Sequence, residues 1–403
     1  MLNRYLRQRV ALVCALLSFA GLAIGDVPKL FPVKVNIGGA SKSGYIDDTG
    51  RIAIEAQFND VAFFWGEMAR VGSRSTTVGG LGSTSFGLID RLGNWVLRPS
   101  HDRLFLSGMR NTLWALNNDE WRLIELDGSD LLGRSFQRVS GFAEGKAVVS
   151  ADDRTIVIDE QGTELFSLSE RGFVTSFPAS YSEGLLIAIA GQPAAGLRTI
   201  VFLDGEGEVA IPARTYLAGG INPFSQGYAA LQEPAPGMIG GGDAFFIDRD
   251  GKRAFGGQVW RGVKSFSEGL AAVSTLSASP SQHRPARWGF IDRNGEMVIE
   301  DIYWDVEPFS EGLAAVAVEL DSLVPGSRDG LWGAIDQNGV MVIEPQFRSP
   351  FRFRDGLAQL FEPYEIHSIA GVELSGPIRG TTMRYIDRNG RTVWDERDHR
   401  PVD

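Results

Sequence analysis

The sequence predicts an all-β repeat protein, most simply a β-propeller of eight or nine units with three to four strands each. Two short motifs recur in step along the chain at a period near 44 residues, which is typical of repeat architectures. Short runs of Ile, Val, Phe and Trp alternate with Gly, Asn and Asp, a pattern that favours strands and tight turns. The 49 glycines point the same way, because glycine is the residue that turns need most often.

The first motif is an apolar residue followed by Asp-x-x-Gly, and it occurs nine times with one degenerate copy at Asp127. From Asp204 to Asp336 its copies are spaced by 44 residues three times in succession. Each Asp precedes a turn, so we expect its side chain to accept hydrogen bonds from the turn backbone. A calcium site is the alternative, but the motif is two residues too short for a calcium loop and has no downstream Glu. The copies begin at Asp47, Asp90, Asp127, Asp159, Asp204, Asp248, Asp292, Asp336 and Asp387.

The second motif is an aromatic residue followed by Ser-Glu-Gly or a relative, and a reshuffled copy covers residues 64–69. Its recurrent Glu is interpreted as a turn residue or a hydrogen-bond partner between units. The copies begin at Phe142, Tyr181, Phe224, Phe266, Phe309 and Phe353. A small apolar strand follows each Glu-Gly, a second strand carries Trp-Gly-Phe-Ile or its equivalent, a third follows the Asp turn, and a short extended piece leads onward. The glycine inside the second strand predicts close approach of a neighbouring backbone.

Four-stranded blades of this length are typical of β-propellers. We expect the ring to close by pairing the strand around residues 33–37 with the strand at residues 392–395, because the last unit ends early. An open, β-solenoid-like array is the alternative, and it needs no closing strand.

These units resemble WG repeats, a bacterial repeat named for the Trp-Gly that precedes the Asp turn. Trp288-Gly289 and Trp332-Gly333 match in full, and Phe86-Gly87 and Gly44-Tyr45 match in part. The resemblance covers most of residues 33 to 396 and is strongest from 245 to 360. It implies an all-β binding or scaffold domain, and it carries over no catalytic residues.

The N-terminus has the pattern of a secretory signal peptide. Three arginines precede an apolar run from Val10 to Ile24, and small residues before Asp26 predict cleavage after Gly25. An uncleaved anchor is the alternative. With residues 1–25 removed, a single domain of residues 26–403 keeps no cysteine and 36 basic against 50 acidic residues. We therefore expect a periplasmic or secreted protein without disulfides or a further membrane span, and no nucleic-acid partner.

The long segments between the Glu-Gly strand and the Asp-turn strand are a candidate binding face, because insertions at one point of a repeat project on one side. Tolerated variation in surface loops is the alternative explanation of their length. They cover residues 72–85, 232–243, 274–287, 319–331 and 361–382, the last being the richest in aromatic and polar side chains. The candidate binding residues on this face are Arg74, His283, Arg287, Arg328, Tyr364, His367 and Arg379.

No catalytic or metal-binding motif emerges, and no histidine has a partner at metal-ligand spacing. We expect a non-catalytic exported scaffold that binds a protein partner in the cell envelope, without cofactor. Binding of glycan or cell-wall polymer is the first alternative, and a hydrolase on the loop face is the second. Most tryptophans recur at fixed unit positions and are assigned to the core, with Trp65, Trp114 and Trp260 left open.

Overall fold

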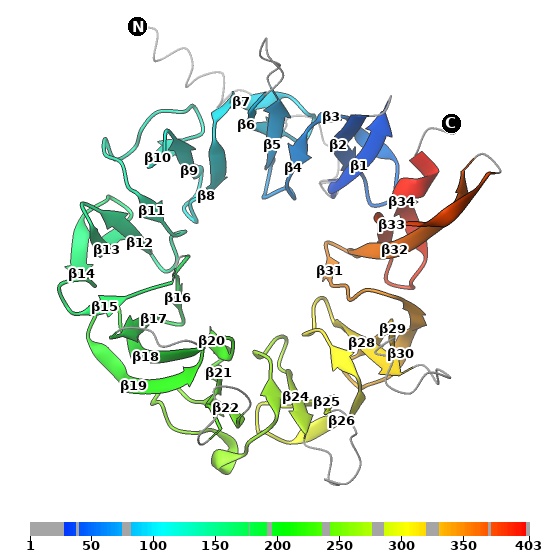
Figure 1. Cartoon of the computed structure of the whole chain (residues 1–403). Coiled ribbons are helices and arrows are strands. Elements are labelled where there is room, and N and C mark those ends of the chain that lie inside the picture. The colour runs from blue at the N-terminus through cyan, green and yellow to red at the C-terminus, as the bar shows by residue number, and fades with distance from the viewer. Residues whose placement is uncertain are drawn as a thin grey trace, which may run out of the picture.

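The strands of the chain form a nine-bladed β-propeller around a central opening (Figure 1). The structure is a computed structural model that describes residues 28–37, 40–74, 82–176, 178–191, 196–235, 242–275, 286–319, 330–369 and 372–399. Within these residues the strands pair into nine separate sheets, one for each Asp-x-x-Gly motif. The propeller prediction is therefore confirmed at nine units, and the open solenoid alternative is wrong.

The blades follow one another along the chain, and each is given from the inside of the ring outward. Blade 1 contains β1 (Phe31–Ile37), β2 (Ala40–Ile46) and β3 (Ile52–Phe58). Blade 2 contains β4 (Asp60–Val61), β5 (Met68–Arg74), β6 (Thr84–Asp90) and β7 (Trp95–His101). Blade 3 contains β8 (Arg103–Leu106), β9 (Thr112–Asn117) and β10 (Glu120–Glu125). Blade 4 contains β11 (Arg138–Val139), β12 (Lys146–Ala151), β13 (Arg154–Asp159) and β14 (Glu164–Ser167). Blade 5 contains β15 (Phe173–Val174), β16 (Tyr181–Ser182), β17 (Leu185–Ala190), β18 (Leu197–Leu203) and β19 (Val209–Leu217). Blade 6 contains β20 (Ile221–Ser225), β21 (Tyr228–Gln232) and β22 (Ala244–Ile247).

Blades 7 to 9 are the most regular, with four strands each. Blade 7 contains β23 (Gly262–Val263), β24 (Ala271–Thr275), β25 (Arg287–Ile291) and β26 (Met297–Tyr303). Blade 8 contains β27 (Asp305–Val306), β28 (Leu313–Glu319), β29 (Gly330–Asp336) and β30 (Met341–Phe347). Blade 9 contains β31 (Phe353–Arg354), β32 (Leu357–Ile369), β33 (Val372–Ile386) and β34 (Thr392–Asp395). Two short 3-10 helices complete the described elements, η1 (Phe255–Gly257) and η2 (Glu396–His399). No helix in the described part of the chain is long and apolar enough to cross a membrane.

The glycine of each Trp-Gly lies where the outer strand crosses closest. A Cβ added at Gly289 would lie 2.5 Å from the Ile299 carbonyl oxygen and 2.7 Å from the Asp301 nitrogen. The register between β25 and β26 shifts at this point, so β26 bulges past the glycine. The predicted close backbone approach is confirmed.

Every Asp of the Asp-x-x-Gly motif caps its own turn. Asp292 accepts hydrogen bonds from the backbone N–H groups of Asn294 at 2.8 Å and Glu296 at 2.9 Å. These bonds lower the pKa of the Asp292 carboxyl, Glu296 contributing the most. The first bond recurs in eight units, and in blade 3, where the turn begins at Glu125, Asp127 accepts the Ser129 N–H at the far end of the turn. The predicted turn-capping role is confirmed.

The Ser-Glu-Gly motif forms a two-residue hairpin turn and ties neighbouring blades together. Glu311 and Gly312 both have positive φ, 54° and 79°, as a type I′ turn requires. The Glu311 carboxylate accepts the N–H groups of Asp355 and Gly356 in the next turn, and the Ser310 hydroxyl donates to the Phe353 carbonyl at 2.8 Å. The predicted inter-blade role of this Glu is confirmed.

We call these bonds the turn ties, and they join five successive blade junctions from blade 4 to blade 9. The acceptor carboxylate or amide belongs in turn to Glu144, Glu183, Gln226, Glu268 and Glu311. A serine donates to the following blade from Ser182, Ser225, Ser267 and Ser310.

The ring closes by packing and not by a shared sheet. The expected pairing of residues 33–37 with residues 392–395 is wrong, since β1 pairs with β2 and β34 pairs with β33. Instead Phe31 and Val33 of blade 1 pack in one buried cluster with Tyr385 and Trp394 of blade 9. The Tyr385 hydroxyl also donates to the Pro32 carbonyl at 2.9 Å. Neither β1 nor β34 is shared between the first and the last blade, so burial of apolar side chains closes the seam.

The tryptophans left open by the sequence differ in burial. Trp114 is 0% exposed and Trp260 is 8% exposed, so both belong to the core, whereas Trp65 is 38% exposed. The two Trp of Trp-Gly pack between blades, Trp288 at the junction of blades 7 and 8 and Trp332 at that of blades 8 and 9.

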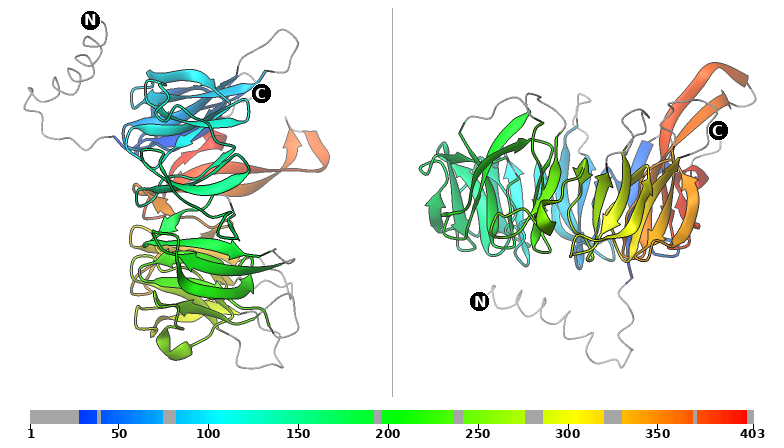
Figure 2. Two further views of the ribbon diagram at one scale, coloured as in Figure 1. Left: turned by 90° about the vertical axis from the view of Figure 1, so that its left-hand side faces the viewer. Right: turned by 90° about the horizontal axis from the view of Figure 1, so that it is seen from below.

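The two faces of the disc carry different connections. The Asp turns and Ser-Glu-Gly turns lie on one face, and each Glu-Gly strand ends, and each Asp-turn strand begins, at the other, which we call the hairpin face (Figure 2). The described ends of the long segments thus lie at one face, and much of each segment lies outside the described residues. Residues 361–382 are not the expected loop, because β32 and β33 extend through most of them as a long hairpin that projects from the disc. We call this hairpin the arm.

Candidate binding site on the inner wall

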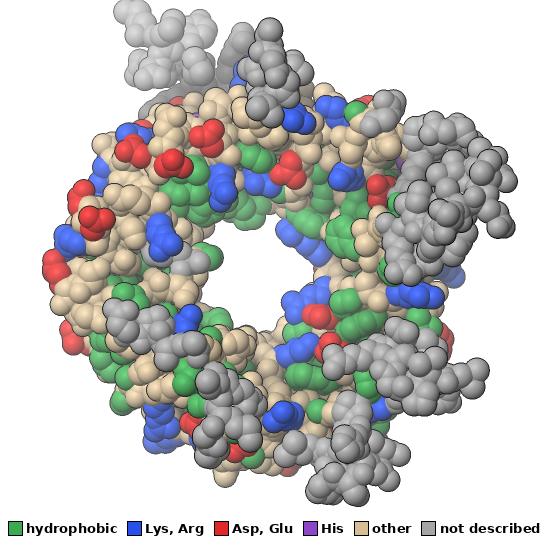
Figure 3. Space-filling view, viewed as in Figure 1, with side chains coloured by type: hydrophobic (Ala, Val, Ile, Leu, Met, Phe, Trp, Pro, Cys, Tyr) green, Lys and Arg blue, Asp and Glu red, His purple; other side chains and the backbone are tan. Residues whose placement is uncertain are grey.

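The innermost strands surround the central opening, and both apolar and cationic side chains reach its wall (Figure 3). Three cavities of about 590, 380 and 650 Å³ adjoin one another along this wall. The first two share Phe63, and the last two share Arg70, Leu104 and Phe105. Together they form a continuous surface from blade 9 past blades 1 and 2 to blade 4, which we call the inner-wall groove.

The first cavity lies at the seam where the ring closes. Within the described residues, blade 1 has no short strand inside β1, and this leaves a gap between blades 9 and 2. Arg354 stands where other turns carry Ser, and its guanidinium reaches across the gap to lie 4.4 Å from the centre of the Phe63 ring. Its Nη2 is 3.5 Å from the Phe64 carbonyl oxygen. Arg352 Nε pairs with Glu307 at 2.9 Å.

A buried tyrosine forms part of this first cavity. Burial raises the pKa of the Tyr385 hydroxyl, so it remains a neutral hydrogen-bond donor over the physiological range. Because that hydroxyl already donates to Pro32, it fixes the seam and leaves recognition to the arginines beside it.

The second cavity lies between blades 2 and 3, and its wall is almost wholly apolar. Trp65 occupies the position of Ser in the turn motif and Gly66 occupies that of Glu, so blade 2 lacks the groups that make the turn ties. Arg70 is the one charged residue among the described lining residues, which are Ala62, Phe63, Trp65, Met68, Arg70, Leu88, Leu104, Phe105, Leu106, Leu113 and Leu126.

The third cavity carries arginines over aromatic rings. Arg70 pairs with Asp60 at 2.9 Å, and its guanidinium lies 4.7 Å from the centre of the Phe86 ring. Phe105 packs edge-on against Trp121 with ring centroids 5.1 Å apart. Arg103 and Arg138 contribute from the innermost strands of blades 3 and 4.

The charge of the inner-wall groove is opposite to that of the chain. Its described lining contains five arginines, with Asp102 and Glu307 as the carboxylates, whereas the whole chain carries −11. Arginine can hold a carboxylate through two parallel hydrogen bonds and can stack on aromatic rings. The arrangement is therefore suited to binding an anionic group beside an apolar one. The arginines are Arg70, Arg103, Arg138, Arg352 and Arg354.

The candidate residues expected on the hairpin face do not form one cluster. Arg74 ends β5 in blade 2, where its Nε donates to the Gly82 carbonyl at 3.1 Å. Arg287 begins β25 in blade 7, and its guanidinium lies 4.8 Å from the centre of the Trp304 ring. Tyr364 lies on the arm in blade 9, and its ring covers Gly380 on the paired strand. Three different blades therefore carry them.

The remaining candidates cannot be placed as side chains. His283 and Arg328 lie outside the described residues. His367 and Arg379 lie on β32 and β33, but their side chains are outside the described part of the structure.

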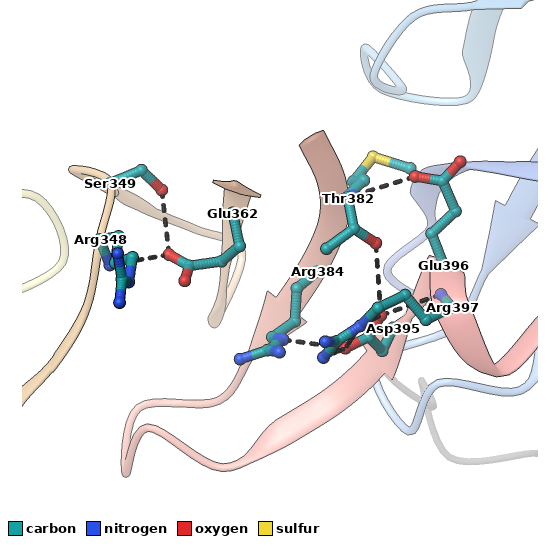
Figure 4. A network of polar contacts seen from close by, with 9 residues as sticks. Arg348, Ser349, Glu362, Thr382, Arg384, Asp395, Glu396 and Arg397 are labelled. Atoms are coloured by element: carbon teal, nitrogen blue, oxygen red, sulfur yellow. Dashed lines mark hydrogen bonds and ion pairs between the residues drawn. The ribbon is translucent and has the colours of Figure 1, made fainter. Parts of the chain in front are cut away.

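A polar network in blade 9 holds the base of the arm (Figure 4). Asp395 is only 4% exposed, and its carboxylate accepts hydrogen bonds from Arg384 and Arg397. Burial alone would raise the pKa of Asp395, but the hydrogen bonds from Arg397 and the charges of Arg397 and Arg384 outweigh it and lower the pKa. On the other side of the arm, Glu362 accepts the Arg348 N–H at 3.0 Å.

The inner-wall groove was not predicted from the sequence. The signal that could have found it lies in departures from the turn motif, since Trp65 and Arg354 both stand where the regular units have Ser. Among the described residues, no group of three His, Cys, Asp or Glu side chains is placed to hold a metal ion.

The described fold can be compared with solved structures. A eukaryotic initiation factor aligns with a TM-score of 0.49 and 11% identity, over 81% of this chain and 90% of that one. Dipeptidyl peptidase 4 of Porphyromonas gingivalis aligns with a TM-score of 0.49 and 7% identity, over 83% of this chain and 64% of that one. The β-propeller domain of the Trilobed protease from Pyrococcus furiosus, described as having an open velcro topology, aligns with a TM-score of 0.37 and 10% identity, over 83% and 96%.

Sequence comparison identifies the repeat itself. None of the curated protein sequences matches the chain significantly. The family model for the WG containing repeat matches residues 44–72, 288–319 and 332–360, which include the Gly44, Trp288-Gly289 and Trp332-Gly333 positions. The chain thus carries WG repeats in these three regions, and its units are the blades of a β-propeller.

Proposed function

We propose that this protein is a non-catalytic scaffold that binds a protein partner in the cell envelope. The inner-wall groove is the observation that carries the proposal. Its three adjoining cavities form an extended concave surface that combines apolar pockets with arginines. Apolar pockets flanked by a few placed polar groups are the usual form of a binding site. An extended surface is suited to a chain more than to a small substrate.

The packing of the ring supports this role. Buried apolar clusters join blade 9 to blade 1, blade 1 to blade 2, blade 2 to blade 3 and blade 3 to blade 4, so the groove is presented on a preformed wall. Binding to a preformed surface costs less conformational entropy than binding that must order the site. The proposed location rests on the signal-peptide pattern of residues 1–25, which lie outside the described residues.

The test is affinity purification of the full-length protein from envelope extracts of its native cells, followed by mass spectrometry and cross-linking. We expect one protein to co-purify in a fixed ratio and to cross-link to blades 2 and 3. The same extracts and purified protein are assayed against ester, glycoside and phosphate substrates and against polysaccharide arrays. Turnover of a substrate, or polysaccharide binding with no protein in fixed ratio, would overturn the proposal.

A further inference from the structure

We propose that the inner-wall groove binds an extended acidic segment of the partner protein and takes one bulky apolar side chain of that segment into the cavity between blades 2 and 3. This inference rests on the proposed function and names the chemistry of the partner. The structure supports it through the shape of that cavity, the charge beside it and the departures from the repeat that create both.

The cavity between blades 2 and 3 provides an apolar pocket. Its volume is about 380 Å³, and leucines, phenylalanines and Met68 form most of its wall. Trp65, 38% exposed, contributes to the wall. A pocket with so few hydrogen-bonding groups gains most from removing an apolar side chain from water. Sugar hydroxyls would lose their hydrogen bonds with water there without replacement, which disfavours a glycan.

Cations stand on both sides of this pocket. Arg103 is exposed, and its side chain has neither a hydrogen bond nor an ion pair within the described residues. On the other side, the side chain of Arg354 is 54% exposed, and its ion pair with Asp355 is long at 3.8 Å. Both guanidiniums can therefore still donate hydrogen bonds to a carboxylate, which is the group that arginine binds best in protein segments.

The charge of the chain selects among anionic partners. A net charge of −11 opposes a highly charged polyanion such as nucleic acid over most of the surface. A short acidic segment on a partner carries its negative charge only where it meets the positive groove. Electrostatic attraction therefore guides that segment to the groove without requiring the rest of the surface to be positive. The apolar pocket selects a bulky apolar side chain, and the arginines beside it select carboxylates. Together they point to a protein segment in which acidic residues surround one Leu, Met or Phe.

The experiment measures binding of synthetic fluorescent peptides to the full-length protein. The probe is a short peptide of Asp and Glu around a single Leu, and it is compared with the same peptide carrying Ser for Leu and with one carrying Lys for every acidic residue. We expect binding that weakens with salt, a loss of about tenfold for the Ser peptide, and no saturable binding of the Lys peptide. Equal binding of all three peptides would overturn the inference.

Variants of the protein locate the site. Arg103→Glu should weaken the acidic peptide at least about tenfold, because it replaces attraction by repulsion. Ala62→Leu should fill the pocket and weaken the Leu peptide while leaving the Ser peptide unchanged. Arg110→Glu, the same charge change on an exposed turn of blade 3 outside the groove, is the matched control. Affinity that is unchanged by Arg103→Glu would overturn the assignment even if Ala62→Leu fails to fold.

The outcomes separate this inference from the proposed function. If a partner protein co-purifies but none of the acidic peptides binds, the groove chemistry is wrong and the scaffold function stands. If anionic polysaccharide displaces the acidic peptide and co-purifies in its place, both are wrong.

Discussion

Blades 7 to 9 and blades 1 to 3 are built from the same repeat and differ in how each blade is joined to the next. In the first region every turn donates and accepts hydrogen bonds across the junction. In the second region the turn of blade 2 reads Trp65-Gly66, and the turn of blade 3 between Ser107 and Thr112 has no Glu. The inner-wall groove runs from blade 9 into this second region, and two of its three cavities are lined mainly by blades 2 and 3. Loss of the turn motif therefore coincides with these two cavities of the proposed binding surface.

In the regular blades, the repeated turn residues have a structural role. A Ser hydroxyl and a Glu carboxylate spaced at the unit period satisfy the turn backbone of the following blade, so each unit fixes the orientation of its neighbour. Where those residues change to Trp or Arg, the same positions point larger side chains into the wall. The proposed function thus rests on residues that break the period.

The largest expected difference between the regions concerns the glycine of Trp-Gly. Gly289→Ala should lower the free energy of unfolding by about 3 kcal/mol, because the new Cβ would collide with the backbone of β26. Blade 3 carries Arg122 at the same unit position, where its side chain pairs with Asp130 on the surface. Arg122→Ala should therefore change the urea midpoint much less. Equal losses would mean that the outer strands of the two regions cross in the same way.

The second difference sets the polar network of blade 9 against an ordinary Asp turn. Asp395→Asn should cost about 2 kcal/mol at neutral pH, because it removes a buried charge from beside Arg384 and Arg397. Since the pKa of Asp395 is lowered in the folded protein, its stabilisation is complete above about pH 5 and declines as the pH falls through 4.

The matched variant for this test is Asp292→Asn, because an Asn side chain can still accept the turn hydrogen bonds. Urea unfolding at several pH values should show a larger pH-dependent loss for Asp395→Asn than for Asp292→Asn, because both carboxyls have a lowered pKa but only Asp395 is buried beside two arginines. A loss that does not depend on pH would show that the charge of Asp395 is not what stabilises the base of the arm.

The third difference compares a bond across the seam with a bond inside blade 5, which lies in the tied part of the ring. Tyr385→Phe should cost about 1.5 kcal/mol, because it leaves the buried Pro32 carbonyl without its donor. Tyr181→Phe removes a longer, part-buried bond of 3.2 Å to the Asp204 carbonyl and should cost about 0.5 kcal/mol. Thermal unfolding of the two variants gives the ranking, and the reverse order would place less of the ring's closure at the seam than the packing indicates.

Recurrence made most of the fold predictable, and the site is where recurrence fails. Nine Asp turns gave nine blades, and Gly289 and Glu311 have the structural roles that their fixed positions indicated. The closing strand was predicted wrongly because seam contacts such as Phe31 with Tyr385 join residues far apart in sequence and follow no period. The groove escaped prediction for the same reason: Phe63 and Arg354 meet only once the ring has formed.

The smallest expected effect tests the turn ties themselves. Glu268 accepts the N–H groups of Glu311 and Gly312 at 2.6 and 2.8 Å, whereas Gln226 at the same position of blade 6 accepts that of Gly269 through its amide oxygen. Glu268→Gln should therefore cost about 0.5 kcal/mol, and Glu268→Ala about 1 kcal/mol, because Gln keeps one acceptor and Ala keeps none. Urea midpoints resolve this order at low salt. If both variants match the unchanged protein, the ties record the alignment of neighbouring turns without stabilising it, and the rigidity of the regular blades must come from apolar packing between them.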